Sequence, residues 1–338
     1  MIISKTKLQE ALEIVRPGLA NNESIEQTTS FAFIEGSIVT YNDEISISHP
    51  VPSLEIRGAV IAEKLYLLLS KIKKDEIDIS IEDSKIVLQS GRAKASFTLI
   101  EEIKLPLNEL SGKKMWKDLP ENFNKHLKFA MASCGRDMSR PVLTCVNVKK
   151  TGVLEASDGY KITSCELSSE MPVKDFLLPV KAALNVVKLQ PVRIAEGKGW
   201  VHFQTEEMTT ISCRIFEDVY PEVSTFLNIK KGIQIVLPIT TEEVLDRAII
   251  FAKRSNVLQE MITITLEKNR FKIHAVADDD AGEFEEEINF KYDEQPISFS
   301  ITPYLLKGIL SETQACELSE NKLKFKGDGW EYLTLLRG

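Results

Sequence analysis

Clustered acidic residues are the first feature of this sequence that could carry out a reaction. Residues 278–280 are three consecutive aspartates, and four glutamates follow within residues 283–287. Carboxylates held together can bind two Mg²⁺ ions and cleave phosphodiesters. The same segment fits an acidic hairpin loop beside a solvated strand, because glutamates at alternate positions share one face. We favour the hairpin, since consecutive aspartates rarely converge on one metal, and keep a metal-dependent nuclease as a rival.

The other residues able to do chemistry show no catalytic pattern. No G-x-x-x-x-G-K-[ST] phosphate loop is present, so no ATPase is indicated. The four histidines lack metal-ligand spacing, and no Ser/His/Asp or Cys/His arrangement is evident. The five cysteines include no C-x-x-C, which is typical of reduced thiols in a cytoplasm. The sequence therefore predicts a protein that is not an enzyme and that binds no metal or cofactor.

The composition is that of a folded chain. It has 338 residues, a formal net charge of −8, 43% hydrophobic residues and 27% charged residues. These values exclude disorder as the main description, and the length predicts two or three domains. No stretch approaches the roughly 18 apolar residues of a membrane span, and the segment MIISKTKLQE lacks an apolar signal core. We expect a cytoplasmic protein with no membrane partner.

Amphipathic segments recur at nearly constant spacing, which indicates an internal repeat. A helical stripe begins at Leu8, and equivalent stripes begin at Phe123 and Val244, at offsets of 115 and 121 residues. A second helix and the strand hairpin after it recur at offsets of 115 and 122 residues. The stripes of these second helices begin at Leu65, Val180 and Thr302. Alternating strand-like runs lie between the helices, with turns expected at Gly36, Gly159 and Asn269.

This repeat predicts an α+β chain of three similar domains. We place them at residues 1–106, 118–227 and 233–338, each with two helices packed on small antiparallel sheets. Segments 101–121 and 217–238, which contain Pro, Gly and charged residues, link the periodic parts.

Positive charge is concentrated in the repeat helices. The six helical segments together have a formal charge of about +8, which leaves about −16 for the rest of the chain. A basic face on an acidic body can hold a polyanion while the remaining surface repels it. Lysine-rich helices that only confer solubility are the alternative explanation.

The repeat and its sequence resemble the bacterial DNA polymerase III beta subunit, the sliding clamp, or a bacteriophage version of it. The most specific stretch is residues 140–167, RPVLTCVNVKKTGVLEASDGYKITSCEL. The segments LLPVKAALNVVK, SCRIFEDVYPEV and ITPYLLKGIL also resemble family motifs. Ser157, Tyr160 and Lys161 replace the family's usual Thr, His and Arg, and the ending YLTLLRG lacks its Met-Pro-Met-Arg-Leu.

The resemblance implies the DNA-clamp fold, with three domains per chain, and a head-to-tail homodimer that closes a ring around double-stranded DNA. Its implied partners are a replicative DNA polymerase, a clamp loader and a second copy of the chain. By resemblance, the apolar residues near the dimer seam are Ala95 and Phe97 in domain one, and Ile250 and Phe251 in domain three. The alternative for Ile250 and Phe251 is the core of domain three.

The resemblance also implies a pocket between domains two and three for a short apolar peptide, typically Gln followed by Leu and Phe. The matching positions are Leu143, Ser157, Gly159, Tyr160, Lys161, Ile162, Pro179, Leu184, Leu333 and Leu335. The leucines and Ile162 would form an apolar floor for inserted anchors, unless they only seal the core between domains.

Basic residues on or beside the repeat helices are candidates to contact DNA phosphates, which provide no sequence information. They are Lys71, Lys73, Lys74, Lys125, Lys128, Arg136, Arg140, Lys181, Lys188, Arg247, Lys253 and Lys307. The sequence thus predicts a DNA sliding clamp that tethers a polymerase. A clamp-fold adaptor that binds proteins without encircling DNA is the alternative, and it predicts a monomer.

Overall fold

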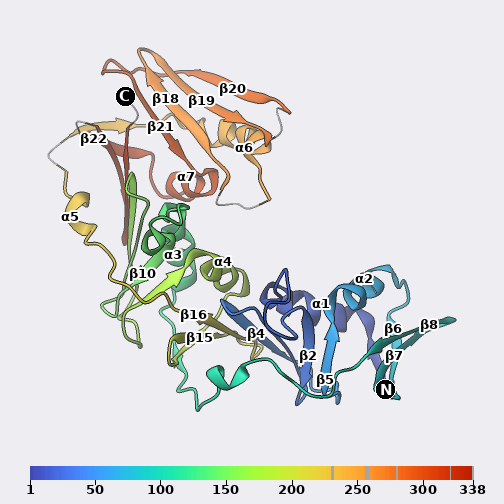
Figure 1. Cartoon of the computed structure of the whole chain (residues 1–338). Coiled ribbons are helices and arrows are strands. Elements are labelled where there is room, and N and C mark those ends of the chain that lie inside the picture. Colours follow the sequence, from blue (N-terminus) through green and yellow to red (C-terminus); the bar gives the residue numbers. More distant parts are fainter. Residues whose placement is uncertain (230–231, 256–258, 279–280, 320, 337–338) are drawn as a thin grey trace. The chain divides into compact units, whose positions relative to one another are not determined.

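A computed structural model describes residues 1–229, 232–255, 259–278, 281–319 and 321–336 (Figure 1). Two compact units form within the chain. Unit 1 contains residues 1–119, 172–174 and 181–217, and unit 2 contains residues 120–171, 175–180 and 218–338. The second repeat contributes to both units, so the units and the repeats divide the chain differently.

Unit 1 is built on two antiparallel sheets. In spatial order, the larger contains β5 (Gly58–Ile61), β2 (Ser30–Ile34), β3 (Ser37–Tyr41), β4 (Ile45–Pro50), β16 (Thr210–Arg214), β15 (Trp200–Gln204), β14 (Arg193–Glu196) and β9 (Lys117–Asp118). The smaller contains β1 (Ile2–Ser4), β6 (Glu76–Glu82), β7 (Lys85–Ser90) and β8 (Ala93–Thr98). Figure 1 shows β4 beside β16, where Ile47 pairs with Ile211. This pairing joins strands of repeats one and two into one sheet.

Unit 2 follows the same plan. In spatial order, its larger sheet contains β13 (Phe176–Pro179), β10 (Cys145–Val148), β11 (Val153–Ser157), β12 (Lys161–Glu166), β24 (Trp330–Leu335), β23 (Lys322–Gly327), β22 (Ala315–Ser319) and β17 (Ile233–Val236). The smaller contains β20 (Glu283–Asn289), β19 (Arg270–Val276), β18 (Ile262–Glu267) and β21 (Ile297–Ile301). Here Ile162 pairs with Leu333. Ile162 lies 115 residues after Ile47, and Leu333 lies 122 residues after Ile211. The two sheet junctions are therefore equivalent in the repeat.

Helices bury their apolar stripes against these sheets. Their bounds are α1 (Lys5–Val15), α2 (Ala62–Lys71), α3 (Phe123–Ala130), α4 (Val180–Leu189), α5 (Ser224–Leu227), α6 (Thr241–Ala252) and α7 (Pro303–Leu310). In α1, the Ser4 side chain caps the first turn by accepting from the Lys7 N–H, and the predicted stripe from Leu8 to Val15 is buried. In α4 the buried residues are Ala182, Ala183 and Val186, so the predicted stripe is displaced around that helix.

The predicted α+β fold with small antiparallel sheets is confirmed, and the structure adds that four-stranded sheets join in pairs. The expected turns at Gly36, Gly159 and Asn269 have positive φ angles of 71°, 92° and 61°. No helix in the described part of the chain is long and apolar enough to cross a membrane.

Candidate functional site

The turn between β11 and β12 is held by its own side chains. The Ser157 hydroxyl accepts the Gly159 N–H at 3.0 Å and donates to the Lys161 carbonyl at 2.9 Å. Asp158 Oδ1 accepts the N–H groups of Tyr160 and Lys161, both at 2.9 Å. Since Gly159 takes a φ of 92°, which side chains disfavour, glycine suits this position. The turn is fixed before any partner binds, and Tyr160 is 72% exposed on it.

The strand pairing brings the C-terminal leucines to this turn. Leu335 donates its N–H to the Tyr160 carbonyl at 2.8 Å, one pair beyond Lys161 and Thr334. Next to it, Ile162 and Leu333 are 7% and 2% exposed. These two side chains are packed in an apolar cluster, so in this structure they are core rather than open floor.

The covering residues come from the segment predicted to link domains two and three, which begins within the family-like stretch SCRIFEDVYPEV. Val223, Leu227, Tyr220 and Ile229 pack on Ile162 and Leu333. The Tyr220 hydroxyl also accepts the Ser157 N–H at 2.9 Å. The apolar spacing within YPEVSTFLNI was the available signal.

A cavity of about 580 Å³ opens beside the turn, and Leu143, Tyr160 and Lys161 line it. Its other lining residues are Cys134, Gly135, Arg136, Asp137, Ser139, Arg140, Asp158 and Met261. The structure therefore gathers eight of the ten predicted pocket residues around the turn and the ends of β12 and β24. Pro179 lies on β13, with β10 and β11 between it and β12, and Leu184 belongs to unit 1.

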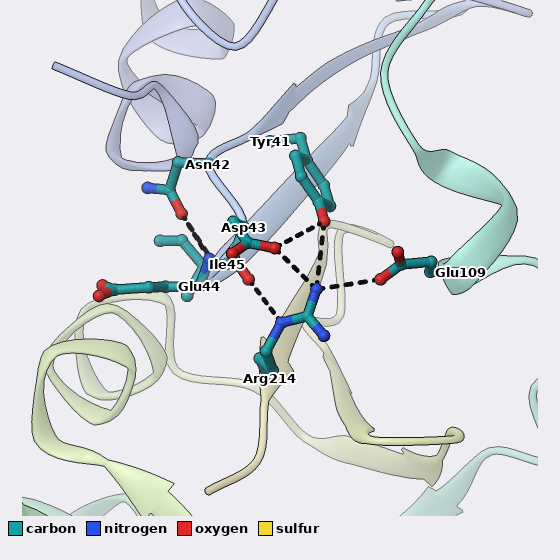
Figure 2. Close-up of polar contacts among 7 residues, drawn as sticks. All are labelled: Tyr41, Asn42, Asp43, Glu44, Ile45, Glu109 and Arg214. Carbon is teal, nitrogen blue, oxygen red and sulfur yellow. Dashed lines mark hydrogen bonds and ion pairs between the residues drawn. The ribbon is translucent and has the colours of Figure 1, made fainter. Parts of the chain in front are cut away.

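The equivalent turn in unit 1 has different surroundings. Asn42 Oδ1 accepts the N–H groups of Glu44 and Ile45, much as the Asp158 carboxylate does in unit 2 (Figure 2). There, however, Arg214 fills the space: its guanidinium bonds Asp43 Oδ1 at 2.8 Å and Glu109 Oε2 at 3.0 Å (Figure 2). The same group lies 4.5 Å above the Trp200 ring. This junction is closed by a paired arginine, whereas the one in unit 2 has a cavity.

Four of the predicted DNA-facing residues have carboxylate partners. Arg247 is bound by both carboxylate oxygens of Glu286 on β20, at 2.6 and 2.7 Å. Lys125 meets Glu312 at 2.6 Å, Lys307 meets Asp246 at 2.8 Å, and Lys181 approaches Glu44 at 3.8 Å. The helix charge count missed these pairs because three of the acidic partners lie outside the helical segments.

The remaining candidates are exposed, and within the described residues none forms an ion pair. They are Lys71, Lys73, Lys74, Lys128, Arg136, Arg140, Lys188 and Lys253. Of these, Arg136 and Arg140 line the cavity beside Tyr160. Among the predicted candidates, the lysines on α2, α3 and α4, or just after α2 and α6, are therefore the most available to an external polyanion.

The predicted seam residues lie on an edge strand of unit 1 and on a helix of unit 2. Ala95 and Phe97 are half-buried on β8, the edge strand of the small sheet of unit 1. In unit 2, Ile250 is 70% exposed on α6, so the alternative that it belongs to the core does not fit. Phe251 is half-buried and stacks on Phe284 of β20, with ring centroids 5.8 Å apart.

The acidic segment is an ordinary hairpin strand in its described part. Glu283, Glu285 and Glu287 alternate along β20, and each pairs with a basic residue of β19. Asp278 is bound by Arg254 at 2.7 Å, while Asp279 and Asp280 lie outside the described residues. Within those residues, no three His, Cys, Asp or Glu side chains are arranged to hold a metal. These carboxylates are engaged by neighbouring basic side chains, as expected of a solvated strand.

Comparison with known proteins gives a consistent picture. No family model matches the chain. It is 21% identical to the beta sliding clamp of Mycoplasma genitalium, over 98% of this chain and 95% of the relative. Among solved structures, it matches the DNA polymerase III subunit beta of Pseudomonas aeruginosa with a TM-score of 0.72 and 18% identity, covering 100% of this chain and 99% of the other.

Two further structures extend the match. A sliding clamp of Bartonella birtlesii bound to griselimycin has a TM-score of 0.74 at 16% identity, with 100% and 99% of the two chains covered. The clamp of Bacillus subtilis has a TM-score of 0.72 at 15% identity, with 100% and 98% covered. The predicted resemblance is confirmed: this chain has the fold of the bacterial beta sliding clamps along its whole length.

Proposed function

We propose that this chain is a DNA sliding clamp, a non-enzymatic processivity factor that acts in the cytoplasm of a bacterial or phage-infected cell. The observation that carries the proposal is the match to beta sliding clamps over the entire chain, in sequence and in fold. A homodimer joined head to tail would close a ring of six domains around duplex DNA. A closed ring cannot leave a duplex sideways, so it needs no strong contact to stay on.

Weak contacts to phosphates suit that mechanism. The exposed lysines without ion pairs, such as Lys73, Lys128 and Lys188, would meet the polyanion through salt-screened attraction. Phosphates look alike along any sequence, so such contacts hold the ring without fixing its position. Sliding follows from contacts that are individually weak and equivalent.

The turn at Tyr160 and its cavity would serve as the docking place for a peptide of the replicative polymerase or the clamp loader. Supporting this role are the preformed turn, the exposed Tyr160 ring and the half-buried Leu143 and Leu335 beside it. An exposed aromatic side chain next to a cavity offers the kind of contact that anchors short peptides.

Retention on DNA tests the proposal directly. We expect the chain, loaded by a clamp loader, to stay on closed circular duplex and to be lost rapidly after the circle is cut, at salt where direct binding is negligible. Native mass measurement should give two chains per particle. Equal retention on circular and linear DNA, or a monomer throughout, would favour the adaptor that does not encircle DNA.

A further inference from the structure

The two sheet junctions share a backbone hydrogen bond that makes their residues comparable one by one. In unit 2 the Leu335 N–H donates to the Tyr160 carbonyl at 2.8 Å. In unit 1 the Arg214 N–H donates to the Glu44 carbonyl at 2.9 Å. Arg214 therefore stands in unit 1 where Leu335 stands in unit 2, and Glu44 stands where Tyr160 does.

The turns at these junctions match as well. Asn42 Oδ1 in unit 1 and Asp158 Oδ1 in unit 2 each accept the N–H groups two and three residues further on. The next residues, Asp43 and Gly159, both have a left-handed backbone, with φ angles of 73° and 92°. Unit 1 thus repeats the backbone of the proposed docking place and differs from it in side chains.

In unit 2 the side chains on this backbone are apolar and accessible. Tyr160 is 72% exposed, and Leu335 is half-buried beside it. The linking segment 217–238 packs on the same junction and presents Phe226, which is 57% exposed. Apolar side chains that remain accessible are those a short apolar peptide needs for its anchors.

In unit 1 the equivalent side chains are charged and joined to one another (Figure 2). The Arg214 guanidinium donates to the Asp43 carbonyl at 2.8 Å, to Asp43 Oδ1 at 2.8 Å and to Glu109 Oε2 at 3.0 Å. It also lies 4.5 Å above the Trp200 ring. Glu109 belongs to segment 101–121, the link between repeats one and two. A single arginine therefore fastens the linking segment to the turn.

This arrangement opposes an apolar ligand. A peptide that entered the junction of unit 1 would have to separate Arg214 from Asp43 and Glu109. Its Leu or Phe anchors would then cover charged groups that they cannot pair, which is unfavourable. The side chains of unit 1 thus select against the class of peptide that the same backbone would accept in unit 2.

We propose that unit 1 contains a closed copy of the partner site, and that Arg214 is the residue that closes it. The inference rests on the proposed function, because it takes the junction of unit 2 as the docking place of the partner peptide. The ligand of the opened copy belongs to the same class, a short peptide with neighbouring apolar anchors. Arg214 determines specificity in this sense: it limits each chain to one partner peptide.

The test counts the peptides bound by the full-length chain. Isothermal titration calorimetry uses the amidated peptide Gln-Leu-Ala-Leu-Phe, and we expect the wild type to bind one per chain. Arg214→Leu, which introduces the side chain of unit 2, should bind two. The second should bind about tenfold more weakly than the first, because Glu44 replaces the aromatic contact of Tyr160. Arg57→Leu, at an exposed arginine of the same unit, is the matched control and should bind one.

The reciprocal substitution locates the second peptide. Leu335→Arg should close the site in unit 2 and abolish binding by an otherwise wild-type chain. Combined with Arg214→Leu, it should leave one peptide per chain, with the affinity of the weaker site. Arg214→Met, whose unbranched side chain can still lie on the Trp200 ring, replaces Arg214→Leu if circular dichroism shows that the latter is unfolded.

Two peptides bound by the wild type, or only one by the folded Arg214 variant, would overturn the proposal. Absence of binding to the wild type would refute the docking place in unit 2, whereas binding to Arg214→Leu would still reveal the copy in unit 1. A peptide that binds neither protein overturns both. Retention on circular DNA is measured in parallel, so that failure of the closed copy is distinguished from failure of the clamp function.

Discussion

Lys125 on α3 donates to Glu312 across 2.6 Å, and Glu312 also accepts the indole N–H of Trp330. The ring centroids of Trp330 and Phe129 are 4.7 Å apart, so Glu312 connects the ion pair to an aromatic contact between repeats two and three. A basic residue on a repeat helix is therefore not always free to bind DNA. The carboxylate that binds Lys125 must be displaced before a DNA phosphate can bind that lysine.

The cations without carboxylate partners should dominate DNA binding. We predict that Lys128→Gln with Lys188→Gln weakens direct binding to duplex DNA and lowers the slope of log affinity against log salt by about 1 per lysine. Arg247→Gln should change the slope much less, because its guanidinium is held by Glu286. Filter binding at several salt concentrations measures both slopes. If Arg247→Gln lowers the slope by as much as one lysine substitution does, the ion pair of Arg247 opens on DNA.

A charge at the predicted seam should separate the dimer without unfolding the chain. Ile250 is 70% exposed, so Ile250→Asp costs little in the isolated chain but would place a charge in an apolar contact. We expect the dissociation constant of the dimer to rise about tenfold or more, measured by sedimentation. Adding Phe251→Asp should also lower stability, because that ring stacks on Phe284.

Val219→Asp is the matched control for the seam, since Val219 is 85% exposed in the same unit. Its dimer should be unchanged, and circular dichroism should show folded protein for Ile250→Asp and Val219→Asp alike. A dimer of normal strength in Ile250→Asp would place the seam elsewhere.

Two leucines of the predicted pocket should behave differently. Leu335→Ala, at a half-buried residue beside Tyr160, is expected to weaken peptide binding by about 2 kcal/mol, roughly 30-fold. Leu333→Ala should instead lower the free energy of unfolding by about 2–5 kcal/mol, since Leu333 is only 2% exposed. Peptide titration and urea unfolding separate these effects. Unchanged affinity in Leu184→Ala would remove that residue from the pocket.

Acid should destabilise unit 1 through His202. Burial lowers its pKa from 6.5 to about 4, and its Nδ1 lies 2.8 Å from the Ser212 hydroxyl. The unfolded chain therefore binds a proton that the folded chain does not, between pH 6.5 and 4. This contribution to stability is complete above pH 6.5 and is lost as the pH falls toward 4, by up to about 3 kcal/mol.

Urea midpoints at pH 7 and pH 4.5 measure that loss. We expect His202→Asn to show a smaller difference between the two midpoints than the wild type. An unchanged difference in His202→Asn would assign the acid sensitivity to other groups.

The repeat made much of the fold predictable. Stripes such as Leu8 to Val15 and turns such as Gly36 are local patterns, and the structure reproduces them. The pairing of Ile47 with Ile211 was out of reach, because edges of two strands far apart in the chain meet without a local signal. The displaced stripe of α4 has a similar cause. Ala182 and Val186 are buried because of tertiary packing, which the spacing of apolar residues does not reveal.

The candidate site was predictable where residues are neighbours in sequence or in strand register. Ser157 to Ile162 form one turn, and Leu333 and Leu335 join them through β24. Pro179 was placed by resemblance to a motif, whereas its strand lies at the far edge of the sheet. The cover by Tyr220 and Leu227 depends on where a linking segment folds back, which depends on tertiary packing.

The shared sheets also mean that a repeat is a unit of sequence but not an independent module. Excising residues 1–106 would strip β16 from β4 and leave Ser46 to Ser48 on a bare edge. Unpaired backbone groups along such an edge invite pairing with another chain. A fragment cut at a repeat boundary should therefore self-associate, whereas one that keeps residues 181–217 with residues 1–119 preserves the whole eight-stranded ladder. Recombination between related chains would, for the same reason, be tolerated better at unit boundaries than at repeat boundaries.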